Sequence, residues 1–87
     1  MILLVDDDVM VRLMATEALI SAGFEVMEAG SGEQALELFD SHGFSLVLLD
    51  VNMSGMDGFE VCRRIRERAH GRRLPVIALT ANALRGE

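Results

Sequence analysis

The chain has 87 residues and a formal net charge of −6, so it can form one small domain at most. About half of the residues are apolar and a quarter are charged, a composition that is typical of a folded domain and excludes a disordered chain. The apolar runs are too short to span a membrane, and the acidic balance argues against direct nucleic-acid binding by this domain.

The first half of the chain alternates short apolar runs with amphipathic segments. Residues 2–5 predict a buried strand, which ends in three consecutive aspartates. The next segment has apolar residues at helical spacing, with Asp8 as a plausible N-cap and Gly23 as a plausible C-terminal stop. Residues 24–27 predict a second short strand, and residues 31–41 predict a second helix.

The second half continues the same alternation. Residues 45–49 predict a third strand, and their successive apolar positions indicate burial on both faces. Asp57 and Glu60 resemble a capping box at the start of the next helix. A fourth strand over residues 76–79 follows Pro75. This order predicts an α/β fold, with a parallel sheet, helices on both of its faces and right-handed crossovers.

Two further features have ordinary structural explanations. The single cysteine, Cys62, cannot form an internal disulfide, so a reducing, cytoplasmic location is expected, with Cys62 on a packed helix face. Six of the eight arginines lie between Arg63 and Arg73. We expect them to form a solvated surface that complements the helix dipole rather than a binding site.

Polar side chains follow three of the predicted strands. Asp6 and Asp7 follow the first strand, Asp50 ends the third, and Thr80 follows the fourth. Because the carboxyl ends of parallel strands meet at one edge of the sheet, we expect these side chains to lie close together. The aspartates after the first strand could serve only as a turn and a helix cap, but a second acidic strand end is hard to explain by capping alone.

Several carboxylates at one edge repel one another and call for a cation. A set of charged oxygen ligands suits Mg²⁺, which keeps several of its waters when it binds. A carboxylate beside Mg²⁺ can also attack a phosphoryl group and form an aspartyl phosphate. The hydroxyl of Thr80 and the backbone N–H groups around Ala81 could hydrogen-bond a phosphoryl oxygen, although capping of a strand end would explain Thr80 equally well.

Three segments, ILLVDDD, LVLLDVNMSGMDGFEV and PVIALTANAL, resemble the receiver domain of two-component response regulators in their order and spacing. The resemblance covers residues 1–87. It implies a flavodoxin-like, doubly wound parallel sheet with strand order 2-1-3-4-5. The fifth strand, its lysine and the last helix have no counterpart in this chain, which contains no lysine. We therefore expect an incomplete domain, whose unpaired strand edge and uncovered apolar face favour a dimer or a strand-exchanged oligomer.

The resemblance also implies a role for each matching residue. Asp50 matches the phosphoacceptor, which takes a phosphoryl group from a sensor histidine kinase or a histidine phosphotransfer protein. Thr80 matches the switch hydroxyl, and Ala81 matches the small neighbour whose backbone contacts the phosphoryl group. The residues that match the Mg²⁺ ligands are Asp7 directly, Asp6 through water, Asn52 through its backbone carbonyl, and Asp50 itself.

Two alternatives to a phosphorylated switch stay open. A pseudo-receiver would keep the fold as a protein-interaction module without being phosphorylated; the missing lysine favours it, but an incomplete domain explains that absence equally well. An aspartyl-phosphate phosphatase of the haloacid dehalogenase type would carry Asp-x-Asp after its first strand, whereas Asp50-Val51-Asn52 follows the third. In the leading interpretation the domain is not an enzyme, although it assists its own phosphotransfer and dephosphorylation.

Overall fold

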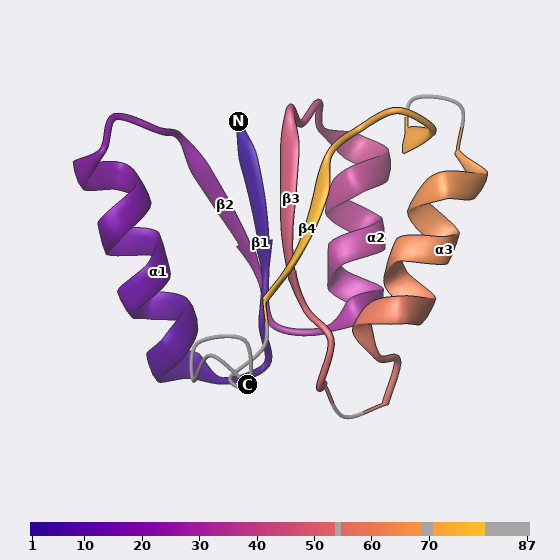
Figure 1. Ribbon diagram of the computed structural model, residues 1–87, viewed down its shortest axis with the longest axis horizontal. Coiled ribbons are helices and arrows are strands. Elements are labelled where there is room, and N and C mark those ends of the chain that lie inside the picture. The colour runs from indigo at the N-terminus through magenta and orange to yellow at the C-terminus, as the bar shows by residue number, and fades with distance from the viewer. Residues whose placement is uncertain (54, 69–70, 80–87) are drawn as a thin grey trace.

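The computed structural model describes residues 1–53, 55–68 and 71–79. In these residues, short parallel strands alternate with helices along the chain (Figure 1). The strands are β1 (Ile2–Val5), β2 (Val26–Ala29), β3 (Leu46–Asp50) and β4 (Val76–Leu79), and the helices are α1 (Val9–Ser21), α2 (Gly32–Ser41) and α3 (Gly58–Glu67). The sheet order is β2-β1-β3-β4 with every pairing parallel, which confirms the predicted α/β fold.

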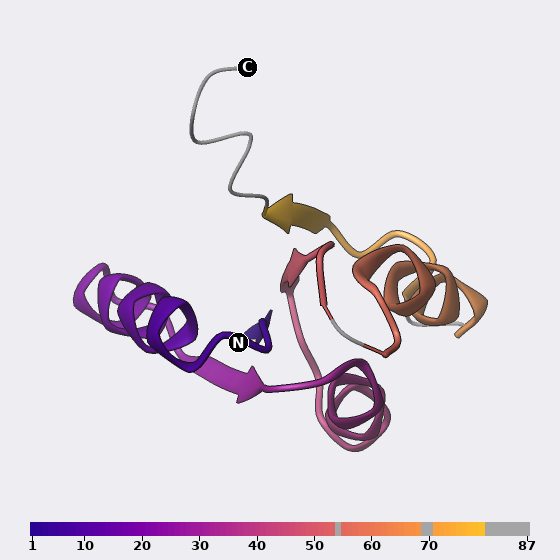
Figure 2. The same cartoon turned by 90° about the horizontal axis from the view of Figure 1, so that it is seen from below.

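The helices cover the two faces of the sheet unequally. Figure 2 shows α1 on one face, beside β2 and β1, and α2 and α3 together on the other face. None of the described helices has the length and apolar character that a membrane span requires.

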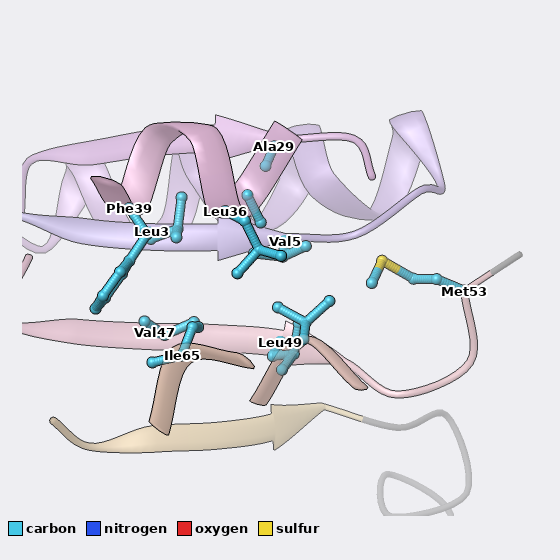
Figure 3. Packing of buried hydrophobic residues seen from close by; sticks show 11 residues of the cluster. Leu3, Val5, Ala29, Leu36, Phe39, Val47, Leu49, Met53 and Ile65 are labelled. Atoms are coloured by element: carbon cyan, nitrogen blue, oxygen red, sulfur yellow. The ribbon is translucent and has the colours of Figure 1, made fainter. Parts of the chain in front are cut away.

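The main core lies between the sheet and the α2–α3 layer (Figure 3). β1 is buried along its whole length because it is a central strand with helices on both sides. Each buried leucine or valine of this kind stabilises the fold by roughly 1.5–3 kcal/mol, so the core holds β1 against β3 firmly. The cluster consists of Leu3, Val5, Ala29, Ala35, Leu36, Phe39, Val47, Leu49, Met53, Val61 and Ile65.

The second strand lies two residues further along the chain than predicted. Gly23 has a φ of 97°, and the Phe24 N–H donates to the Leu19 carbonyl at 3.1 Å, which closes the end of α1. The Phe24 N–H is therefore hydrogen-bonded to the end of the helix and not to a strand. β2 starts at Val26, which pairs with Ile2. The third strand is also shifted by one residue, because Asp50 still pairs with Leu79 of β4.

The expected burial of β3 on both faces is wrong. Val47 and Leu49 are buried against the α2–α3 layer, whereas Leu46 and Leu48, on the opposite face, are only half-buried. The reason is the position of α1, which lies over β2 and β1.

The helix caps mostly agree with the sequence. Asp8 and Asp57 are the N-caps of α1 and α3, as predicted. The reciprocal half of the capping box is replaced by ion pairs, because the Glu60 carboxylate accepts hydrogen bonds from Arg63 and Arg64.

Two further arginines of this region, Arg66 and Arg68, also have partners within the fold. Arg68 pairs with Asp40 of α2, and Arg66 donates to the backbone carbonyls of Gly71 and Leu74. These contacts join α2 to α3 and hold the loop that leads into β4. Arg66 and Arg68 therefore have structural roles, whereas the sequence predicted a solvated surface.

The outer surface of α1 is apolar. Six of its apolar side chains are between 47% and 65% exposed: Val9, Met10, Val11, Leu13, Met14 and Ile20. Association of copies of the chain through an exposed apolar face of this kind stays a prediction.

Thr16 offers a test of packing under α1. Its Oγ1 is buried and has no hydrogen-bond partner in the part of the chain that the structure describes. We expect Thr16→Val, which keeps the shape and removes the polar atom, to raise the free energy of unfolding by about 1 kcal/mol. Thr16→Ser is the control, since it keeps the hydroxyl and loses a methyl group; it should lower stability. Urea denaturation measures both, and a less stable valine variant would show that the hydroxyl is satisfied.

Candidate functional site

Three carboxylates meet at the carboxyl edge of the sheet, the lower edge in Figure 1. Asp6 and Asp7 directly follow β1, and Asp50 is the last residue of the neighbouring strand β3. One carboxylate oxygen from each lies within 4.8 Å of the other two. Asp6 is the most enclosed of them, with only 4% of its surface exposed. The structure thus brings together the three acidic residues that the sequence assigned to this edge.

Two of these carboxylates are oriented by the chain that follows them. The Asp8 N–H donates to Asp6 Oδ1 at 2.9 Å, and the Asn52 N–H donates to Asp50 Oδ1 at 3.1 Å. Each contact is an Asx turn, in which a side chain binds the backbone two residues later. One oxygen of each of these two carboxylates is therefore held by its own loop, which limits the rotation of the side chain.

The position of Asp6 within the cluster changes the pKa of its carboxyl group. Burial raises the pKa of the Asp6 carboxyl above its usual value, and the neighbouring Asp50 and Asp7 add to this rise. The hydrogen bond from the Asp8 N–H opposes the rise but does not cancel it. The fold therefore disfavours the charged form of the Asp6 carboxyl.

The donor set fits a hard divalent cation. Mg²⁺ binds its oxygen ligands at about 2.1 Å in an octahedral arrangement, so neighbouring and opposite ligands are about 3–4 Å apart. The oxygens of Asp6, Asp7 and Asp50 lie within 4.8 Å of one another and need only small side-chain movements to meet that requirement. The charge of the ion would also relieve the repulsion that raises the pKa of Asp6.

The start of α3 packs directly against the end of β3 and the residue that follows it. The Gly58 N–H donates to the Val51 carbonyl at 3.3 Å. A Cβ on Gly58 would lie 2.5 Å from the Asp50 carbonyl oxygen and 2.6 Å from the Val51 Cα, so only glycine fits. In the loop between them, Gly55 adopts a φ of 74°, a conformation that favours glycine.

The remaining residues assigned from the sequence have different outcomes. Asn52 lies exposed on the loop, with its N–H bound to Asp50; a role for its carbonyl stays a prediction. Thr80 and Ala81 lie outside the described residues. Sequence reasoning missed Arg12, whose side chain donates to the Asp6 backbone carbonyl. The only signal was one arginine within the apolar stretch VMVRLMA.

Comparison with known proteins identifies the family. Residues 2–85 match the model of the response regulator receiver domain, so the chain belongs to that family. It is 41% identical over 87 residues to the sensor histidine kinase RcsC of Salmonella typhimurium, covering 100% of this chain and 9% of that protein. The chain spans only 9% to 31% of the length of the first curated relatives that it matches.

Solved structures show the same fold. The chemotaxis protein CheY4 of Vibrio cholerae superposes with a TM-score of 0.87 at 30% identity, over 97% of this chain and 73% of that one. A structure of the histidine kinase ThkA in complex with the response regulator TrrA matches with a TM-score of 0.84 at 40% identity, over 92% of this chain and 67% of that one. The flavodoxin-like architecture implied by the resemblance is therefore confirmed.

The contact between α3 and β3 leads to a stability prediction. We expect Gly58→Ala to lower the free energy of unfolding by about 2 kcal/mol, because its Cβ must displace backbone atoms. Gly43→Ala is a matched control, since a Cβ there meets nothing within 4 Å. Denaturant unfolding of both variants provides the measurement. An equal, small effect at the two positions would show that α3 can move away from Asp50.

The raised pKa of Asp6 predicts a pH dependence. Because the folded state holds this proton more tightly than the unfolded state, Asp6 lowers stability progressively as pH rises through its folded-state pKa. In EDTA at pH 7, Asp6→Asn should therefore be more stable than the parent, and the difference should shrink towards pH 4. Thermal unfolding across this range tests the prediction.

The control for this experiment is Glu37→Gln, which removes an exposed carboxylate on α2. A stability gain for Asp6→Asn that is equal at all pH values, or equal to that of the control, would contradict an effect from the buried Asp6 charge.

Proposed function

We propose that this chain is a phosphoacceptor switch of a two-component system, in which Asp50 accepts a phosphoryl group. The observation that carries the proposal is the placement of Asp50 at the end of β3, with oxygens of Asp6 and Asp7 within 4.8 Å of its own. A carboxylate in that position can attack phosphorus while its neighbours hold the cation that the phosphoryl group requires.

The transfer follows from the orientation of Asp50. Its Oδ1 is held by the Asn52 N–H, which leaves Oδ2 as the attacking oxygen. The donor in this proposal is a phosphohistidine. The new bond joins Oδ2 to phosphorus, and the bond from phosphorus to the histidine nitrogen breaks. The electron pair of that bond stays on the nitrogen, which takes up a proton. Mg²⁺, when bound, neutralises the charge on the phosphoryl oxygens. Asp6 and Asp7 supply its carboxylate ligands in this proposal.

The donor is proposed from the chemistry and from the relatives. Phosphoryl transfer to a carboxylate needs a high-energy donor, and phosphohistidine meets that need. RcsC is a sensor histidine kinase, and the ThkA–TrrA structure pairs a histidine kinase with a response regulator. A sensor histidine kinase or a histidine phosphotransfer protein is therefore the proposed partner of this chain.

Phosphorylation would act on the rest of the domain through charge. A phosphoryl group adds about −1.5 to −2 charges at neutral pH. It would arrive at an edge where burial, together with the neighbouring carboxylates, already disfavours the charged form of Asp6. In the proposal, Thr80 and the backbone of Ala81 rearrange to bind the new oxygens, and this change is transmitted to an output domain or partner.

The direct test uses a small phosphoryl donor. The chain is incubated with acetyl phosphate and Mg²⁺, and intact masses are recorded. We expect one added phosphoryl group on the parent and on Asp40→Asn, an exposed aspartate of α2, but none on Asp50→Asn.

The same experiment separates the alternatives. A folded parent chain that gains no phosphoryl group would favour the pseudo-receiver. An adduct that persists on Asp50→Asn would place the acceptor at another residue.

A further inference from the structure

The side chain of Arg12 connects three elements beside the acidic cluster. It leaves the first turns of α1 and reaches back to the sheet, where its Nε donates to Glu28 Oε1 of β2 at 3.0 Å. Its Nη1 donates to the backbone carbonyl of Asp6 at 2.8 Å. The Arg12 side chain is only 20% exposed. Its position is therefore defined by these contacts rather than by solvent.

The carbonyl that Arg12 binds is part of the peptide bond between Asp6 and Asp7. A peptide group is planar, so the orientation of the Asp6 carbonyl also sets the direction of the Asp7 N–H and the position of the Asp7 Cα. On its other side, the Asp6 N–H donates to the Ala29 carbonyl at 3.1 Å. The chain is thus held by β2 before Asp6 and by Arg12 after it.

We infer that Arg12 is a positioning residue for the cation site: it fixes the Asp6–Asp7 peptide and thereby the direction from which the Asp7 carboxylate reaches a bound ion. This inference rests on the proposed function, since it assumes that the acidic cluster binds Mg²⁺. Arg12 itself touches neither the ion nor a phosphoryl group in this assignment. Its effect passes through the backbone.

The charge of Arg12 is balanced by its partner. The ion pair with Glu28 makes the two side chains neutral together, so Arg12 can hold the loop without cancelling the negative charge that attracts a cation. Arginine suits this task because its planar fork offers two donors in a fixed geometry, which a lysine ammonium cannot reproduce. Gly30 leaves the room for it, since a Cβ there would lie 2.9 Å from Arg12 Nη1.

A positioning role and a purely electrostatic role of Arg12 predict opposite changes in Mg²⁺ affinity when its side chain is replaced. Arg12→Met keeps most of the apolar stem but leaves Glu28 unpaired, so charge alone would make Mg²⁺ binding tighter. A positioning role makes it weaker, by about tenfold, as is typical when a partner that orients metal ligands is lost. Arg12→Lys keeps the charge and loses the fork, and we expect it to fall between the parent and Arg12→Met.

Arg66→Met is the matched control. Arg66 is also partly buried, and it donates to the backbone carbonyls of Gly71 and Leu74 at 2.8 and 2.5 Å. These contacts lie near the amino end of β4, far from the acidic edge. Both methionine variants should lose stability, but only Arg12→Met should change the affinity for Mg²⁺.

The experiment measures Mg²⁺ affinity by isothermal titration calorimetry, with urea unfolding of each variant in EDTA. Weaker binding by Arg12→Met and Arg12→Lys, with parental affinity in Arg66→Met, supports the inference. Unchanged or tighter binding in the folded Arg12 variants overturns it. A parent chain that binds no Mg²⁺ overturns the cation site of the proposed function as well, so the two failures are distinguishable.

A second variant covers the case in which Arg12→Met does not fold. Gly30→Ala leaves Arg12 and every carboxylate in place but pushes the guanidinium from its position through the added Cβ. We expect it to weaken Mg²⁺ binding several-fold with a small loss of stability. Parental affinity in this variant would contradict the need for the observed Arg12 geometry.

Discussion

The structure depends on one electrostatic constraint, the close approach of three carboxylates at the end of two neighbouring strands. Oxygens of Asp6, Asp7 and Asp50 are held within 4.8 Å of one another although their charges repel. The apolar core holds them there, because buried β1 and the buried face of β3 fix where the two strands end. Carboxylate oxygens this close together suit a hard divalent cation.

The two halves of the site are built in the same way. In each, an aspartate at the end of a strand or directly after it accepts a hydrogen bond at Oδ1 from the backbone N–H two residues later, and a capped helix follows. The supports differ, however. Arg12 of α1 ties down the chain after β1 with hydrogen bonds, whereas Gly58 of α3 lets backbone pack on backbone after β3. One half is therefore held by a polar side chain and the other by the absence of a side chain.

Membership of the receiver family places the chain among the receiver domains of two-component systems, but it does not define the response. The chain matches 9% of the length of a sensor kinase and 31% of that of a probable transcriptional regulator. One receiver fold thus occurs in proteins with different further parts. Among the described residues, the outer face of α1 is also exposed and apolar, and its role depends on what it contacts.

The sequence by itself determined the order of strands and helices, the caps at Asp8 and Asp57, and the edge at which Asp50 would meet the acidic residues after β1. These features depend on local rules, namely apolar periodicity, the side-chain oxygens that cap helices, and the common direction of parallel strands. All of them act within a few residues or follow from the strand order.

Only the tertiary structure decided the rest. The start of β2 depended on the bond from the Phe24 N–H to the end of α1, and the half-buried face of β3 depended on where α1 lies. The link from Arg12 to the Asp6 carbonyl and the contact of Gly58 with Asp50 depend on backbone atoms brought together by packing. Backbone carbonyls are the same in every residue, so the identities of the side chains carry little information about which one an arginine will bind.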